Sequence, residues 1–266
     1  MIDGEPPRGL RAGVPKGLTL RALVPNAITA AALCAGLTGI RFAITGEFRM
    51  AVAAVIIAGV LDGLDGRMAR LLKAQSHFGA ELDSLADNVS FGVAPALVLF
   101  MWSLQEVPRF GWFAALAFAV CMALRLARYS ARIDMPDEPR KQSGFLTGVP
   151  SPVGAGLAFL PMYLSFVTGR PEFSDPQLVG AWLVLIALLA ISSLPTLSWS
   201  KLRPRRSMRL ALIAVAGLLV ALLLTEPWLA LIAISTIYLA MIPVGAIAYA
   251  RLMRRRAMCQ QQAGPA

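Results

Sequence analysis

Residues 61–90 read LDGLDGRMARLLKAQSHFGAELDSLADNVS, and this stretch contains five of the 15 acidic residues of the chain. Asp62 and Asp65 are three residues apart and Asp83 and Asp87 are four apart, so each pair shares one face of a helix. The short basic turn between the pairs makes the two helices antiparallel neighbours. The spacing therefore predicts that four carboxylates meet near one end of a helix pair.

Four acids in an apolar setting require compensation, because each carboxylate at a bilayer centre costs about 2.5–3.5 kcal/mol on insertion scales. Arg67 and Arg70 offset part of this charge, but an all-oxygen cluster suits hard divalent cations such as Mg²⁺, Mn²⁺ or Ca²⁺ better. Two such ions balance four negative charges. The alternative is that the acids pair with bases and that their small neighbours serve helix packing. Those neighbours are Gly66, Ala69, Gly79, Ala86 and Ser90.

The rest of the sequence predicts a membrane protein. Hydrophobic residues make up 57% of the 266 residues, charged residues 15%, and the mean hydropathy is +0.66. A soluble domain has about 45–50% apolar and roughly 25% charged residues. The net charge of +10 comes from bases placed between apolar runs, which argues against a nucleic-acid partner. Three cysteines without a CxxC pair and a single histidine, His77, argue against a zinc site.

The predicted fold class is all-α, a polytopic membrane bundle of about eight transmembrane helices with both termini cytoplasmic. The apolar runs are 24–45, 49–72, 79–104, 110–132, 150–168, 178–197, 208–224 and 227–250. With this assignment, 21 of the 25 basic residues fall on one side of the membrane. The other four are Arg41, Arg49, Arg109 and Arg170. An assignment with seven helices would distribute the basic residues over both sides of the membrane.

The signature Asp62-Gly-Leu-Asp65-Gly66-Arg-Met-Ala69-Arg70, followed by Gly79, Asp83 and Asp87, resembles that of the CDP-alcohol phosphotransferases. Within that family, residues 78–96 resemble the bacterial membrane-embedded phosphatidylserine synthases. Three further segments share this resemblance: Pro25-Asn26 with Thr29, RLAR at Arg125 to Arg128, and GVPSP at Gly148 to Pro152. The chain departs from the subfamily pattern at Tyr129-Ser130 and at Val149.

The resemblance implies transfer of a phosphatidyl group from CDP-diacylglycerol to the hydroxyl of L-serine, with release of CMP. It implies two divalent cations per site, Mg²⁺ or Mn²⁺, with Asp62, Asp65, Asp83 and Asp87 as ligands and Asp87 also as the general base. It further implies CDP contacts from Gly66, Ala69, Arg70, Gly79, Asn26 and Thr29. We also expect a homodimer in the bacterial inner membrane, in contact with membrane lipids. Its active site is expected on the cytoplasmic side.

The predicted organisation has four parts. Residues 1–22 form a cytoplasmic segment without a signal-peptide pattern. Residues 23–200 form the catalytic membrane domain, residues 201–256 add two transmembrane helices, and residues 257–266 form a disordered tail.

Acceptor recognition is the part with open alternatives. Arg125 and Arg128 share a helix face, where either one is suited to clamp the carboxylate of serine or to anchor the helix to lipid phosphates. Glycerol 3-phosphate, inositol phosphate or an amino alcohol are the alternative acceptors. An ion-coupled transporter is the alternative from another class, but its acids would lie near the membrane midplane rather than toward one face.

Overall fold

The computed structural model describes residues 20–133, 145–192, 195–197 and 208–262, and the chain in these ranges is almost entirely helical. In chain order the first elements are α1 (Leu20–Ile44), α2 (Phe48–Leu71), α3 (His77–Asp87), the π-helix η1 (Asn88–Val93), α4 (Ala94–Trp102), the short 3₁₀ helix η2 (Leu104–Glu106) and α5 (Pro108–Ile133). They are followed by β1 (Phe145–Thr147), α7 (Ser151–Ala158), α8 (Leu160–Thr168), the 3₁₀ helix η3 (Pro171–Ser174), α9 (Pro176–Ile191), β2 (Pro195–Leu197), α10 (Met208–Thr225) and α11 (Pro227–Gln262).

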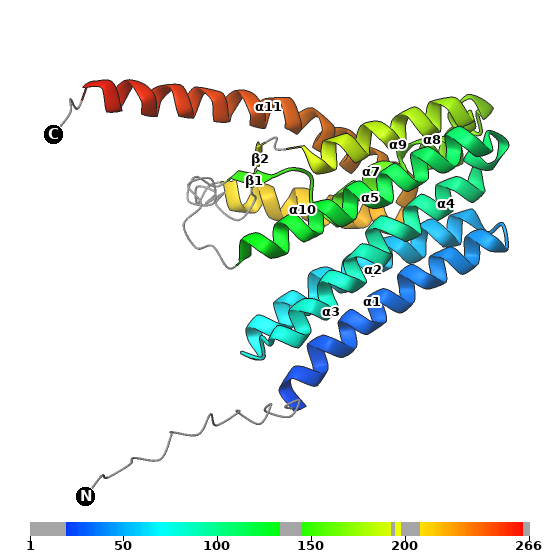
Figure 1. The fold of residues 1–266 in the computed structure, drawn as a ribbon, viewed down its shortest axis with the longest axis horizontal. Coiled ribbons are helices and arrows are strands. Elements are labelled where there is room, and N and C mark those ends of the chain that lie inside the picture. Colours follow the sequence, from blue (N-terminus) through cyan, green and yellow to red (C-terminus); the bar gives the residue numbers. More distant parts are fainter. Residues whose placement is uncertain (1–19, 134–144, 193–194, 198–207, 263–266) are drawn as a thin grey trace, which may run out of the picture.

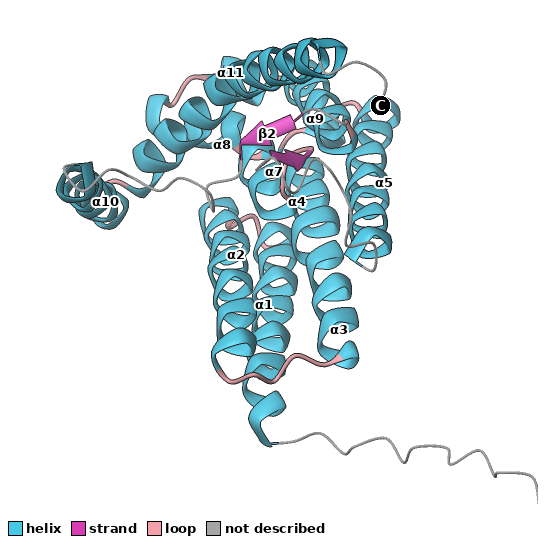
Figure 2. Cartoon of the chain, turned by 90° about the vertical axis from the view of Figure 1, so that its left-hand side faces the viewer, coloured by secondary structure: helices cyan, strands magenta, loops and turns pink. Residues whose placement is uncertain are grey.

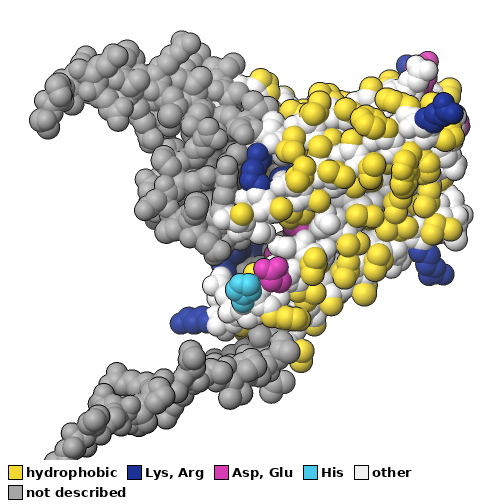
Figure 3. Space-filling view, in the orientation of Figure 1, with side chains coloured by type: hydrophobic (Ala, Val, Ile, Leu, Met, Phe, Trp, Pro, Cys, Tyr) yellow, Lys and Arg dark blue, Asp and Glu magenta, His cyan; other side chains and the backbone are white. Residues whose placement is uncertain are grey.

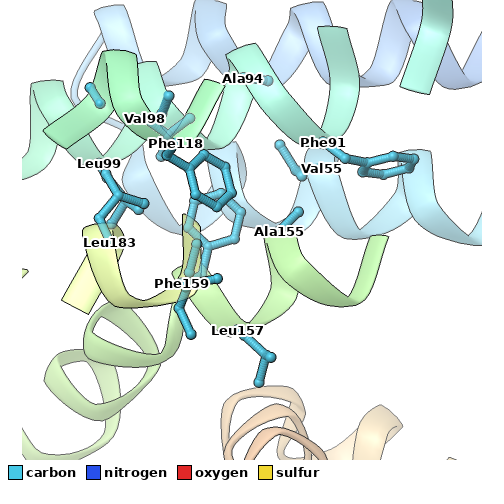
Figure 4. Packing of buried hydrophobic residues seen from close by; sticks show 14 of the residues in the cluster. Val55, Phe91, Ala94, Val98, Leu99, Phe118, Ala155, Leu157, Phe159 and Leu183 are labelled. Atoms are coloured by element: carbon cyan, nitrogen blue, oxygen red, sulfur yellow. The ribbon is translucent and has the colours of Figure 1, made fainter. Parts of the chain in front are cut away.

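The helices from α1 to α9 form one bundle with a common core, in which α1 packs against α2 and α5 packs against α9 (Figure 1). Buried aromatic residues from three parts of the chain meet in this core: Phe91, Phe118 and Phe159 (Figure 4). Helix α10 stands apart from the bundle and packs mainly on α11 (Figure 2). The acids of α2 and α3 therefore belong to the main bundle.

Four helical stretches are long and apolar enough to cross a membrane: Leu23–Ile44, His77–Trp102, Pro108–Arg128 and Ser151–Thr168. They coincide with four of the predicted spans. Hydrophobic side chains cover a broad belt of the visible face, and charged side chains gather toward its two ends (Figure 3). This distribution is typical of a protein that lies in a bilayer. The chain is thus an integral membrane protein with a helical fold, while the full count of eight spans stays a prediction.

Two predicted segments differ from the observed helices. The run 178–197 does not stay helical, because α9 ends at Ile191 and Pro195 begins strand β2, which pairs antiparallel with β1. Proline has no N–H to donate to a helix, so the chain leaves the helical path there. The last helix, predicted over 227–250, continues to Gln262 and so enters the region predicted as a disordered tail.

A proline also divides the predicted helix 150–168 into α7 and α8. Pro161 has no N–H for the carbonyl of Leu157 four residues earlier. The indole nitrogen of Trp182 on α9 donates to that carbonyl instead, at 2.9 Å. The break is thus compensated by a side chain from a neighbouring helix.

The predicted helix 79–104 contains the π-helix η1, which begins directly after Asp87. Short π segments inside helices are frequent at functional sites because they change the direction of the residues that follow. Here Ser90 is turned against α1. A Cβ placed on Gly36 would lie 2.5 Å from the Ser90 hydroxyl, so only glycine allows this approach. Ser90 therefore serves helix packing, as the alternative for the small residues predicts.

Candidate active site

Three of the four predicted acids meet in space. Oxygen atoms of Asp62, Asp83 and Asp87 all lie within 4.8 Å of one another. Asp62 comes from α2, while Asp83 and Asp87 lie one helical turn apart on α3. The antiparallel pairing predicted from the sequence thus brings both helices to one carboxylate cluster.

Asp65 lies beside this cluster and is held by helix α1. The hydroxyl of Thr29 donates to Oδ2 of Asp65 at 2.6 Å, and both side chains are only 5% exposed. The same hydroxyl lies 3.1 Å from the carbonyl oxygen of Pro25. Thr29 had been expected at a nucleotide site, and its observed contact is with one of the four acids.

The donor set fits a divalent cation. Oxygen ligands from three carboxylates are what Mg²⁺ and Mn²⁺ prefer. Within the described part of the chain, neither Arg67 nor Arg70 forms an ion pair with these acids. Oδ1 of Asp83 is buried and has no hydrogen-bond partner. Unneutralised carboxylates at such short separations repel one another, so the cluster is suited to a cation that occupies the space between them.

A cavity of about 340 Å³ adjoins the acids. It is lined by Pro25, Asn26, Thr29, Asp65, Gly66, Ala69, Ala74, Gln75, Ser76, Gly79, Ala80 and Asp83. Five of the six residues expected to contact CDP are in this set, namely Gly66, Ala69, Gly79, Asn26 and Thr29. The structure therefore brings the predicted nucleotide residues and two of the acids to one hollow.

The packing of the cavity wall explains why a small residue occupies position 79. A Cβ on Gly79 would lie 2.9 Å from Oδ1 of Asn26, so a larger residue would push the Asn26 amide aside. Nδ2 of Asn26 is buried without a hydrogen-bond partner and remains available as a donor to a ligand. Arg70 is not part of the lining, but its Nη1 lies 3.7 Å from the Cβ position of Gly66. Its guanidinium group therefore lies over the cavity wall.

The two residues expected to bind the acceptor lie away from this cavity, on helix α5. Arg125 donates to the hydroxyl of Ser151 at the start of α7, and Arg128 donates to the carbonyl of Ser192 at 3.3 Å. Neither arginine lines the 340 Å³ cavity. Gly148, whose φ of +76° favours glycine, places its Cβ position 3.7 Å from Nη2 of Arg128.

Sequence reasoning missed the role of the turn before α3. Gln75 and Ser76 line the cavity, and Ser76 also caps α3 by accepting a hydrogen bond from the backbone N–H of Gly79 at 3.0 Å. A serine just before a helix is a recognisable N-cap signal, so the cap could have been found from the sequence. The role of Gln75 had no such signal, because it depends on where the turn lies against α1.

The chain matches the CDP-alcohol phosphatidyltransferase family over residues 22–193, and residues 207–243 match the related CDP-alcohol phosphatidyltransferase 2 family. The first match covers all four acids, the cavity and both arginines. The chain therefore belongs to the CDP-alcohol phosphatidyltransferase family.

Several relatives carry the name CDP-diacylglycerol–serine O-phosphatidyltransferase. The protein of this name from Mycobacterium tuberculosis is 38% identical over 237 residues, which cover 89% of this chain and 80% of the relative. The Helicobacter pylori protein is 34% identical over 181 residues, covering 68% of this chain and 74% of the relative. That from Methanocaldococcus jannaschii is 36% identical over 141 residues, covering 53% and 60%.

Proposed function

We propose that this protein transfers a phosphatidyl group from CDP-diacylglycerol to the hydroxyl of L-serine, giving phosphatidylserine and CMP. The observation that carries the proposal is the convergence of Asp62, Asp83 and Asp87 beside the 340 Å³ cavity. A nucleotide in this cavity has its diphosphate next to the acids. The shared name of the relatives, which extends over most of the chain, supports serine as the acceptor.

Asp62, Asp65, Asp83 and Asp87 are the residues that we assign to the divalent cations, which the family generally requires. Bound there, Mg²⁺ or Mn²⁺ supplies neutralisation of the diphosphate charge and polarisation of the phosphorus under attack. The lone Oδ1 of Asp83 and the absence of an ion pair from Arg67 or Arg70 in the described chain support this assignment. Asp65 is oriented by the Thr29 hydroxyl, so α1 contributes to the position of the ligand set.

Asp87 is the residue that we assign as the general base. A carboxylate oxygen of Asp87 takes the proton of the serine hydroxyl, the serine oxygen forms a bond to the β-phosphorus, and the bond from that phosphorus to the CMP oxygen breaks. Asp87 lies one turn deeper in the helix than Asp83, which faces the cavity. We therefore assign Asp83 to the side where the nucleotide binds and Asp87 to the side where the acceptor hydroxyl binds.

CDP is held by the cavity lining. The Asn26 amide offers a buried donor, Gly66 and Gly79 keep the backbone close to the ligand, and Ala69 leaves room beside them. Arg70 extends over Gly66 and is suited to a phosphate.

Arg125 and Arg128 are proposed to recognise the carboxylate of serine. Each holds a neutral oxygen in the structure, the Ser151 hydroxyl or the Ser192 carbonyl, and each of these is a weaker partner than a carboxylate. A phosphorylated acceptor would also suit two arginines, so glycerol 3-phosphate and inositol phosphate remain the second candidates.

The orientation and organisation of the protein are also proposals. We place eight spans in the bacterial inner membrane, with both termini and the acids on the cytoplasmic side. Helix α1 begins and helix α11 ends toward the same side of the bundle, which supports this orientation (Figure 1). Residues 23–200 are proposed as the catalytic domain, residues 201–256 as two added helices, and the active unit as a homodimer.

The experiment that tests the function uses purified protein with CDP-diacylglycerol, Mg²⁺ or Mn²⁺, and labelled serine, glycerol 3-phosphate or inositol phosphate in parallel. Labelled lipid from serine alone, lost after chelation and restored by the cation, is the expected result. Labelled lipid from glycerol 3-phosphate or inositol phosphate would show that the acceptor is that compound and not serine. No CMP release from any mixture would overturn the proposed reaction.

A further inference from the structure

Asn88 is a polar residue inside the apolar bundle to which the proposed mechanism gives no role. It follows Asp87 directly and is the first residue of the π-helix η1. Oδ1 of Asn88 is buried and accepts no hydrogen bond from any residue that the structure describes. Buried polar atoms are normally paired, because an unpaired one has lost its hydrogen bonds to water without replacement. An unpaired oxygen next to the proposed base is therefore placed to contact a substrate.

The Asn88 side chain lies at the contact between η1 and α5. One turn before it, the hydroxyl of Ser84 lies 3.1 Å from the hydroxyl of Ser130 on α5. One turn after it, the Cβ position of Gly92 lies 3.2 Å from Oδ1 of Asn88 and 3.4 Å from Cβ of Met122 on α5. These two contacts run in opposite directions along the two helices. Asn88 thus lies opposite the turn of α5 that is midway between Met122 and Ser130.

That turn of α5 carries Arg125, whose Nη1 donates to the hydroxyl of Ser151 at the start of α7. The π-helix packs against both α5 and α7, so it lies next to the helices that hold this pair. On its other side, Asp87 reaches the acid cluster with Asp62 of α2. Around the end of α3, the order is therefore the proposed base, then the Asn88 oxygen, then the arginine proposed for the carboxylate of serine.

This order matches the three polar groups of L-serine, which are carried by three neighbouring carbon atoms. The hydroxyl belongs at Asp87 and the carboxylate at Arg125. The ammonium group is a donor of three hydrogen bonds and requires an acceptor within about 3 Å. An amide oxygen meets that need without adding a further negative charge beside the four acids.

We propose that Oδ1 of Asn88 accepts a hydrogen bond from the ammonium group of the acceptor, and that Asn88 thereby selects an amino-bearing acceptor. The inference rests on the proposed function, because it takes L-serine as the acceptor. It assigns to one residue the choice between serine and a hydroxy acid of the same length.

The test compares L-serine with 3-hydroxypropionate, which is serine without the amino group, by CMP release from CDP-diacylglycerol. The wild type is expected to favour serine in kcat/KM by at least about tenfold, as for a hydrogen bond to a charged group. Asn88→Leu has a similar size but no oxygen. It is expected to lower kcat/KM for serine by about tenfold or more, chiefly through KM, and to leave 3-hydroxypropionate nearly unchanged.

Two further variants separate the oxygen from the packing of the helix. Asn88→Asp retains an oxygen at this position and is expected to retain the preference for serine. Ser84→Ala is the matched control, because it removes a hydroxyl from the same contact with α5 one turn away and leaves Asn88 in place. Its ratio of the two kcat/KM values is expected to equal that of the wild type.

An unchanged ratio in an active Asn88→Leu protein would overturn the proposal and leave the reaction intact, as would equal use of both acceptors by the wild type. An equal change of the ratio in Ser84→Ala would also overturn it, because the helix contact and not the oxygen would then be responsible. If Asn88→Leu does not fold, Asn88→Ala decides the question through the same ratio. Absence of CMP release with every acceptor would instead refute the proposed function.

Discussion

At the scale of single residues, the Thr29 hydroxyl links helix α1 to the acids. Its hydrogen bond to Asp65 is 2.6 Å long and buried on both sides. Hydrogen bonds to charged groups contribute about 1.5–3 kcal/mol. The first helix thus supports the acids directly through this contact, although it contributes none of the four acids.

Thr29→Val removes this hydroxyl with little change of shape. Asp65 then loses its only α1 donor, and we expect affinity for CDP to fall by about tenfold or more, corresponding to the lower end of that energy range. Calorimetric titration of CDP into the cation-loaded protein measures the effect. Thr29→Ser retains a hydroxyl and should restore most of the affinity. Equal affinities in Thr29→Val and the wild type would show that the contact has no part in binding.

Asp62→Asn and Asp83→Asn each remove one negative charge from the cluster. We expect each to lower Mn²⁺ affinity and to reduce turnover by at least about 100-fold, since even residues behind metal ligands contribute about 10–100-fold. Mn²⁺ binding followed by electron paramagnetic resonance gives the affinity. Glu81→Gln is the matched control, because Glu81 is an exposed acid on the same helix as Asp83. Near-normal activity in both aspartate variants would contradict the metal assignment.

The Asp87→Asn variant tests whether Asp87 acts as the general base or only as a metal ligand. Asparagine still offers an oxygen to a cation but cannot accept the proton of serine, so we expect turnover to fall by about 10²–10⁴-fold while CDP-diacylglycerol still binds. Donor affinity and turnover are measured on the same preparation. A proportionate loss of both would make Asp87 chiefly a metal ligand, and a retained rate would remove it from the mechanism.

At the scale of the elements, two breaks in helical geometry shape the bundle. The π-helix after Asp87 turns Ser90 toward Gly36 of α1, which holds the acid-bearing helix close to the first helix. The break between α7 and α8 is stabilised by Trp182, whose indole replaces the N–H that Pro161 lacks. Both breaks lie beside one apolar cavity, which Phe91 and Leu157 line.

Trp182→Phe leaves the Leu157 carbonyl without its donor. A buried polar group without a partner costs about 1–3 kcal/mol, so we expect a lower apparent Tm. Trp112→Phe is the comparison, because Trp112 is 50% exposed and keeps its edge contact with Phe100 through the remaining ring. Thermal unfolding in one detergent compares the variants. A Tm of Trp182→Phe equal to that of Trp112→Phe would show that the α7–α8 break does not need the indole.

At the scale of the whole molecule, the acids and the turn between α2 and α3 lie at one end of the bundle, opposite the turn between α1 and α2 (Figure 1). Arg67, Arg70 and Lys73 lie at the same end as the acids, in the last turns of α2 and in the α2–α3 turn. Because bases are retained on the cytoplasmic side, the charge pattern of the sequence predicts that this end of the bundle faces the cytoplasm.

A labelling experiment tests this orientation. In a cysteine-free background, Glu47→Cys and Lys73→Cys each place one exposed thiol, in the α1–α2 turn and the α2–α3 turn respectively. In right-side-out membrane vesicles, an impermeant maleimide should label the Glu47 variant and spare the Lys73 variant, and inverted vesicles should give the opposite pattern. Labelling of both positions from the same side would contradict the predicted topology.

The sequence by itself determined the membrane class, most helix positions, the family resemblance and the pairing of Asp62 with Asp83 and Asp87. These features depend on apolar runs, on helical spacing and on a short turn, all of which are local along the chain. Pro195 is the local feature that indicates an end of α9 before residue 197, but it lies inside the apolar run 178–197, which by its length alone predicts one continuous helix.

Only the tertiary structure decided which groups share a space. It separated Asp65 from the tight cluster and joined it to Thr29, and it placed Gln75 at the cavity beside the acids. It also set Arg125 and Arg128 against Ser151 and the Ser192 carbonyl. It also formed an apolar cavity between α2, α7 and α11. These contacts join residues far apart in the chain, and they depend on how helix faces pack and on where prolines and the π-helix redirect them, which no local pattern records.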